Sequence, residues 1–285
     1  MSAEFRVPDG LPDALRVGVF ATPRSFQAWI RFSNGSETPQ DDGAPDGRGM
    51  AVKLLDVAGS RSTTQDFVMI NSPAFFVRNA VDYVDFQTAN PPWRFFLPGW
   101  NPLAVRLHEF MAARAITGRT TVNPLDSRYW SMTPYSLGPA ACKFSAAPVG
   151  PPSAFSDTAA PDFLYDNMVR HLAAAGAEFD FQVQMRTDPA ATPIEDPTVE
   201  WMEAQAPFVP VARIVIPLQA FDQPDRRAFG ENLSFTPWHG LDAHRPLGGI
   251  NRVRRTVYET ISCLRHELNG VPRREPAPAT TENLR

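Results

Sequence analysis

The sequence of 285 residues has few of the features that mark secreted, membrane-spanning or nucleic-acid-binding proteins. It contains two cysteines, Cys142 and Cys263, which stand far apart and form no CxxC pair, so a disulfide framework is excluded and a cytoplasmic location is predicted. No apolar run approaches the ~18 residues of a membrane-spanning helix, and the N-terminus lacks the pattern of a signal peptide. The net charge of −4 gives no indication of nucleic-acid binding.

Common catalytic and cofactor motifs are also missing. The sequence has no GxSxG nucleophile elbow, no Walker loop and no GxGxxG fingerprint. None of its five histidines form an HxxxH or HExxH pair, and the nearest two, His239 and His244, are better explained as hydrogen-bonding loop residues than as metal ligands. A zinc site and the usual nucleotide-binding loops are therefore not predicted.

Hydrophobic patterning predicts the fold class. Alternation of apolar and polar residues indicates strands at 27–33, 50–57, 65–70, 178–187 and 211–219, with a strand–turn–strand pattern at 128–149. Helices are predicted at 74–89, 101–117, 162–176 and 251–268. Because strands come in runs rather than alternating singly with helices, we expect an α+β fold. We expect its antiparallel sheet to close into a β-barrel, which removes the sheet edges.

The predicted domain organisation is simple. We expect a single domain over residues 1–270, followed by a polar, disordered tail over 271–285. In the predicted helix at 101–117, the residues expected to point inward are Leu103, Leu107, Phe110 and Met111.

The helix at 251–268 carries the most informative pattern. Its apolar residues recur at helical spacing and predict one buried stripe, formed by Ile250, Val253, Val257, Ile261, Leu264 and Leu268. Beside this stripe, Arg254 and Tyr258 lie one turn apart, and Arg265 follows two turns later. A neighbouring cation is expected to lower the pKa of the Tyr258 phenol. A phenolate can bind haem iron, and an arginine can hold a carboxylate. From spacing alone, surface arginines flanking a boundary tyrosine are the favoured explanation.

Two further blocks decide between these explanations. The stretches IRFSNGS and DGRGMAVKLLDV (30–57) resemble a conserved strand pair of catalases, and DFVMINSPAFFVRNAVDYVDF (66–86) resembles the catalase segment that follows it. Together with the Arg–Tyr–Arg spacing of the last helix and the PWHGLDAHRPLG stretch before it, they bracket most of residues 5–268. The sequence therefore resembles the catalase family, in particular its small, catalase-related branch.

This resemblance implies a set of site residues around haem b. Tyr258 would be the proximal iron ligand, Arg254 its phenolate partner, and Arg31 and Arg265 the propionate ligands. Ser33, on the same strand face as Arg31, would lie near the distal side. The aromatic walls implied by the resemblance are Phe75, Phe76 and Tyr83.

The sequence departs from the family pattern on the distal side. Catalases place a distal histidine before the RFS strand, where it acts as acid and base, but no histidine precedes His108 here. The family's distal asparagine position falls on Ile70, and Asn71 follows one residue later. Strand alternation puts Asn71 on the opposite face unless a bulge intervenes, and it is kept as the candidate distal residue. Either a longer native chain supplies the histidine or the chemistry is altered.

The resemblance implies an oxidoreductase that decomposes or reduces hydrogen peroxide or organic peroxides, with a small-molecule electron donor. Peroxidase activity, which oxidises an organic donor, is favoured over catalase activity, which evolves oxygen. A homo-oligomer is expected by analogy. Two alternatives stay open: rearrangement of fatty-acid hydroperoxides, as in allene oxide synthases, and haem binding with little turnover.

Overall fold

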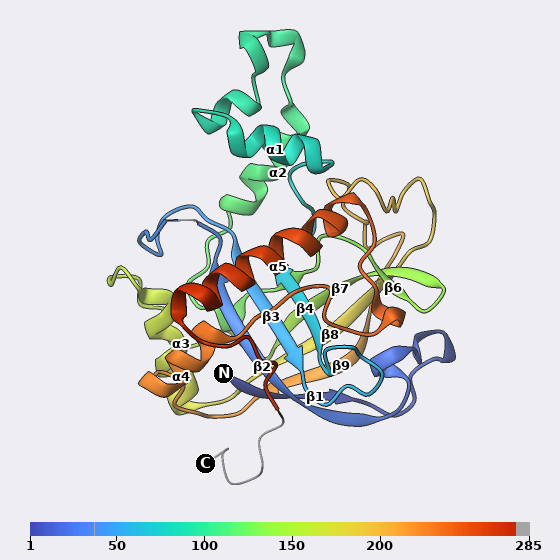
Figure 1. Cartoon of the computed structure of the whole chain (residues 1–285), viewed down its shortest axis with the longest axis vertical. Helices are drawn as coiled ribbons and strands as arrows, with labels where there is room; N and C mark the ends of the chain where they lie inside the picture. The colour runs from blue at the N-terminus through green and yellow to red at the C-terminus, as the bar shows by residue number, and fades with distance from the viewer. Residues whose placement is uncertain (37, 278–285) are drawn as a thin grey trace.

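Nine antiparallel strands form the centre of the molecule in the computed structural model, which describes residues 1–36 and 38–277 (Figure 1). The strands are β1 Ser2–Val7, β2 Arg24–Asn34, β3 Arg48–Leu54, β4 Gln65–Ile70, β5 Tyr129–Trp130, β6 Tyr135–Leu137, β7 Ala140–Val149, β8 Ala177–Met185 and β9 Phe208–Ile216. Their order is β5-β4-β3-β2-β1-β9-β8-β7-β6, and an additional pairing of β5 with β7 closes eight of them into a barrel. The predicted antiparallel barrel is confirmed.

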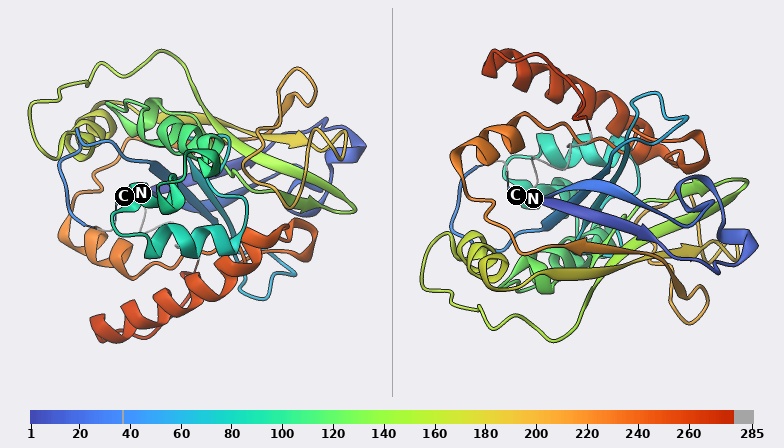
Figure 2. Two further views of the ribbon diagram at one scale, coloured as in Figure 1. Left: turned by 90° about the horizontal axis from the view of Figure 1, so that it is seen from above. Right: turned by 90° about the horizontal axis from the view of Figure 1, so that it is seen from below.

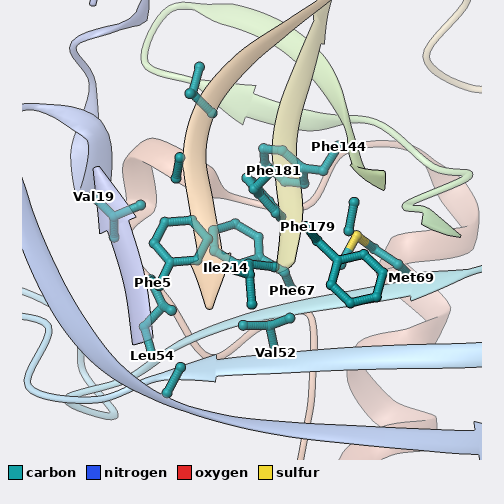
Figure 3. Close-up of a cluster of buried hydrophobic side chains, with 14 of the residues drawn as sticks. Phe5, Val19, Val52, Leu54, Phe67, Met69, Phe144, Phe179, Phe181 and Ile214 are labelled. Carbon is teal, nitrogen blue, oxygen red and sulfur yellow. The ribbon is translucent and has the colours of Figure 1, made fainter. Parts of the chain in front are cut away.

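Strand alternation separates the inside of the barrel from its outside. Phe5, Phe67, Phe144 and Phe181 point inward and are almost fully buried (Figure 3). The ring centroids of Phe67 and Phe181 lie 4.7 Å apart, and those of Phe5 and Phe181 lie 5.1 Å apart. The barrel interior is thus a packed aromatic core, and any ligand site has to lie outside it.

Five α-helices surround the barrel: α1 Ala80–Thr88, α2 Leu107–Thr117, α3 Phe163–Ala174, α4 Pro224–Asn232 and α5 Gly249–Asn269. Helix α5 runs across the outer face of β2, β3 and β4, and both views in Figure 2 place it outermost on that side. No helix among the described residues has the length and hydropathy needed to cross a membrane.

Residues 78–119, here called the lobe, project from one end of the barrel (Figure 1). They contain α1, three short 3-10 turns and α2. Both predicted helices start later than expected. The Asn79 side chain accepts the backbone N–H groups of Val81 and Asp82 and so caps α1 at Ala80. Prolines in the turns before Leu107 shorten the second helix.

The predicted tail is partly described. Arg273 pairs with Glu259, and the Glu275 carboxylate lies 2.6 Å from the Lys53 ammonium group on β3. Residues 278–285 lie outside the described residues. At least the first part of this polar segment therefore packs against the domain.

Candidate functional site

Helix α5 is attached to the domain through a polar side. Asn251 is fully buried, and its side-chain amide donates to the carbonyl oxygens of Pro134 (3.0 Å) and Leu247 (2.9 Å). Further along the same side, Ser262 and Ser234 share a 2.6 Å hydrogen bond, and His266 is buried. These contacts fix which face of α5 turns toward the solvent.

The expected buried stripe of α5 is largely exposed, which corrects the sequence-based prediction. Ile250 is buried at the start of the helix, but Val257 is 46%, Ile261 57% and Leu268 77% exposed. The physical reason is that Asn251, Ser262 and His266 occupy the buried side, and the apolar residues lie away from it on the helical circumference. Polar anchoring of this kind cannot be recognised from the sequence, because the helical spacing of apolar residues shows that they share a face but not whether that face is buried.

Arg254 and Tyr258 make the contact that their spacing predicts. One guanidinium nitrogen of Arg254 donates to the Tyr258 hydroxyl oxygen at 3.1 Å, and the other donates to the Asn251 side-chain oxygen at 3.1 Å. Burial opposes the charge of Arg254, but the nearby oxygens of Tyr258 and Tyr135 outweigh it and raise the pKa of Arg254. The guanidinium therefore stays charged beside the phenol oxygen at any accessible pH.

An apolar pocket of about 180 Å³ opens beside this pair. It is lined by residues of three segments far apart in sequence: Phe75 and Tyr83 at and just before the lobe, Met132 and Thr133, and residues of α5 such as Val257. The Phe76 ring packs behind Phe75, with centroids 4.9 Å apart. The structure thus brings four sequence-predicted residues, Phe75, Tyr83, Arg254 and Tyr258, to one pocket, and Phe76 to its outer wall.

Arg31 and Arg265 form a second, cationic part of the site. The Arg265 guanidinium donates to the carbonyl oxygens of Glu231 and Leu233, each at 2.6 Å. Burial and then the positive charge of Arg31 lower the pKa of Arg265. Among the described residues no carboxylate pairs with the exposed Arg31. Two guanidinium groups that repel each other without a shared anion are a suitable place for a carboxylate ligand.

The outer face of β2–β4 under α5 is made of small and aliphatic residues. Strand pairing aligns Arg31, Ala51 and Val68 in one row across the sheet, and Ser33, Gly49 and Ile70 in the next. Ala51, Val68 and Ile70 are half-buried, and α5 passes over the strands β3 and β4 that carry them (Figure 1). This part of the strand face therefore keeps apolar side chains that the domain's own packing does not fully bury.

Asn71 does not lie on this face. Its side-chain oxygen accepts the Arg48 backbone N–H at 2.9 Å, and the residue is buried at the end of the barrel. Its side-chain nitrogen has no partner among the described residues. The pairing of β3 with β4 is regular to its end, so Ile70 takes the outward position. The distal role suggested for Asn71 is not supported by its position.

The two loop histidines are structural. His244 is buried, and its Nε2 accepts the Val19 backbone N–H at 3.0 Å. Burial lowers the pKa of His244 to about 4. His239 lies in a cluster with Lys53, Asp66 and Glu275. Within the described part of the chain, no group of three or more His, Cys, Asp and Glu side chains is arranged to hold a metal ion.

The residues present fit a flat, apolar cofactor with two carboxylates. A phenol held by a half-buried arginine stands beside an apolar pocket, a pair of arginines lacks a shared anion, and the strand surface under α5 carries small or aliphatic side chains apart from Arg31. Haem b has these requirements: an axial ligand, apolar walls and anchors for its propionates.

Comparisons with known proteins show a similar sequence and a shared fold. No sequence-family profile matches the chain. The chain is 28% identical over 270 residues to a catalase-related peroxidase from Mycolicibacterium paratuberculosis, which covers 88% of this chain and 80% of that protein.

The structure is also similar to solved catalases. A fungal catalase superposes with a TM-score of 0.72 at 21% identity, covering 94% of this chain. Catalase A from Saccharomyces cerevisiae (0.71, 18% identity) covers 99% of this chain, and a bacterial catalase (0.70, 14% identity) covers 97%. The chain spans 57–65% of the length of these catalases. The chain is therefore similar in sequence to a catalase-related peroxidase, and it shares the fold of solved catalases.

Proposed function

We propose that the chain binds haem b between α5 and the outer face of β2–β4 and reduces peroxides with it. The observation that carries this proposal is the 3.1 Å contact of Arg254 with the Tyr258 hydroxyl at the edge of an apolar pocket. The bound iron porphyrin would supply the redox chemistry that cleaves the peroxide O–O bond.

The residues around the pocket would divide the task of holding this group. Tyr258 would bind the iron from the proximal side, and Arg254 would fix the position of its phenol oxygen through their 3.1 Å hydrogen bond. Arg31 and Arg265 would bind the propionates, which would also relieve their mutual repulsion. Phe75, Phe76 and Tyr83 would form an aromatic wall. These roles agree with the contacts described above.

The side chains of the distal face favour peroxidase activity over catalase activity. Ile70 stands at the outward position that the family resemblance assigns to a distal asparagine, and its neighbours Gly49, Ala51 and Val68 cannot transfer protons. Ser33 is the hydroxyl residue of this face, in the row of Gly49 and Ile70. Steady-state oxygen evolution from hydrogen peroxide is expected to be slower than oxidation of an organic donor, and a clear excess of oxygen evolution would overturn this assignment. A cytoplasmic location and a homo-oligomer stay predictions.

The proximal assignment has a direct spectroscopic test. The chain reconstituted with haem is expected to give a five-coordinate ferric tyrosinate spectrum, and Tyr258→Phe is expected to abolish it. Tyr165→Phe is the matched control, because Tyr165 lies on α3 and its buried hydroxyl has no hydrogen-bond partner among the described residues. A tyrosinate spectrum that survives Tyr258→Phe would show that another residue holds the iron.

The apolar distal face also favours a second candidate, a haem-binding protein with little turnover. The same reconstituted chain distinguishes the two. A tyrosinate spectrum without measurable peroxide consumption, in the presence of an organic donor, would support haem binding alone.

A further inference from the structure

The lobe presents an unusual amount of apolar surface for the outside of a protein. Leu103 is 95% exposed and Trp100 is 66% exposed, and both lie in the turns between α1 and α2. The other large exposed apolar residues of the lobe are Val81, Val84, Trp93, Val105, Leu107, Phe110 and Met111. Leu103, Leu107, Phe110 and Met111 were predicted to point inward, and the structure shows the opposite. A patch of this kind marks a surface that contacts something else.

The lobe does not need these residues for its own core. Its interior is a separate aromatic cluster in which the Phe86 ring lies 5.5 Å from that of Phe95 and 6.1 Å from that of Phe96. At the tip, the indole rings of Trp93 and Trp100 lie 4.9 Å apart. Trp100 has a φ of +60°, which a bulky side chain rarely adopts. The chain thus holds an exposed tryptophan in an unfavourable backbone conformation, which indicates a functional role for this side chain.

Charge separates the lobe from the rest of the molecule. Residues 78–119 contain five arginines and three carboxylates, a net charge of +2, whereas the whole chain carries −4 and the remainder therefore −6. The three carboxylates are all neutralised within the lobe, since Arg78 pairs with Asp82 and Glu109, and Arg106 with Asp85. In the described part of the chain, Arg94 and Arg114 have no carboxylate partner. The apolar patch is therefore accompanied by unpaired positive charge.

We propose that the lobe docks on the surface of an anionic lipid bilayer. Tryptophan and leucine side chains next to arginines are the combination that binds at the boundary between head groups and acyl chains. Anionic head groups would neutralise Arg94 and Arg114. A lobe-to-lobe contact between two copies is a poorer arrangement, because it would bring two cationic surfaces together. No described helix could span the bilayer, so the lobe would lie on its surface.

Docking would also connect the lipid to the candidate site. The aromatic side chains continue from the lobe to the pocket: the Phe96 ring lies 5.5 Å from Phe110, and the Phe76 ring lies 4.8 Å from Phe86. Tyr83 of α1 lines the pocket beside Tyr258. Hydroperoxides of membrane lipids would then be the nearest substrates. This consequence rests on the proposed peroxidase function, whereas docking itself does not.

The test measures binding without activity. The full chain is sedimented with vesicles of phosphatidylcholine alone or mixed with phosphatidylglycerol, at low and at high salt. We expect binding to the anionic vesicles, weakened by salt, and a decrease of tenfold or more in the double variant Trp100→Ser/Leu103→Ser. The double variant Arg94→Gln/Arg114→Gln should lose the preference for phosphatidylglycerol.

Matched controls are available elsewhere on the surface. Met202 and Leu218 are exposed to a similar degree outside the lobe, and Arg274 is exposed near the C-terminus, so Met202→Ser/Leu218→Ser and Arg274→Gln should bind like the wild type. The proposal is overturned if the wild type stays in the supernatant at low salt, or if the lobe variants bind as well as the controls. It is equally overturned if light scattering shows a dimer that Trp100→Ser/Leu103→Ser dissociates while vesicles bind nothing.

Discussion

Asn251 is expected to hold α5 in place more strongly than any exposed residue of the apolar stripe. Its side chain donates to two carbonyl oxygens and accepts from Thr133 (3.1 Å) and from Arg254 (3.1 Å). Each neutral hydrogen bond contributes about 1 kcal/mol to stability, and one to a charged group contributes about 1.5–3 kcal/mol. Because Asn251 is fully buried, water cannot replace these partners, and we expect Asn251→Ala to lower the free energy of unfolding by about 4.5–6 kcal/mol.

The matched comparison is Leu268→Ala, near the other end of the same helix. Replacing a buried leucine by alanine lowers the free energy of unfolding by about 2–5 kcal/mol. Leu268 is 77% exposed, however, so we expect a change within about 0.5 kcal/mol. Urea unfolding of both variants, without added haem and monitored by tryptophan fluorescence and circular dichroism, gives the two values. A larger loss for Leu268→Ala than for Asn251→Ala would refute the assignment of the polar side as the anchor.

Two further predictions concern the distal face and the buried histidine. Ile70→Asn should raise the ratio of oxygen evolution to donor oxidation in the haem-loaded chain, because it places a hydrogen-bonding side chain at the outward position of β4. Val68→Thr, in the neighbouring row, is the control and should leave this ratio unchanged. An unchanged ratio in Ile70→Asn would contradict the proposed distal face. His244 has a pKa of about 4 when folded against ~6.5 when unfolded. The unfolded chain therefore takes up this proton first as pH falls from ~6.5 to 4, and the free energy of unfolding should fall by about 2 kcal/mol between pH 7 and 5. Denaturant titrations at both pH values should show a smaller fall for His244→Gln.

The barrel and the proximal pair were accessible from sequence because both depend on local patterns. Alternation over residues 27–33 and 65–70 defines which side chains face the core, and the four-residue spacing of Arg254 and Tyr258 places them on one helix face. The same alternation predicts that Asn71 lies on the opposite face from Ile70, and in the structure its side chain does point away from the outer face. Where a property follows from strand or helix period alone, the prediction agrees with the structure.

Burial was harder to predict, since it depends on what covers a face. The apolar residues of α5 and those around Leu103 were both expected to be buried, and both are exposed for different reasons. On α5, three polar residues form the attachment. In the lobe, Phe86, Phe95 and Phe96 already fill the interior, so the other large apolar side chains stay largely exposed. Amphipathic patterning identifies the faces of an element but not their partners.

Polar attachment of α5 has a functional consequence. A helix that relied on its apolar face for stability could not offer that face to a ligand, because the ligand would have to displace the domain's own packing. Here Asn251 both anchors the helix and positions the Arg254 guanidinium beside Tyr258, while Val257 and Ile261 stay exposed. Attachment and ligand binding are thus assigned to different sides of one helix. We therefore expect the domain to fold before it meets its cofactor, with the proximal pair already in contact.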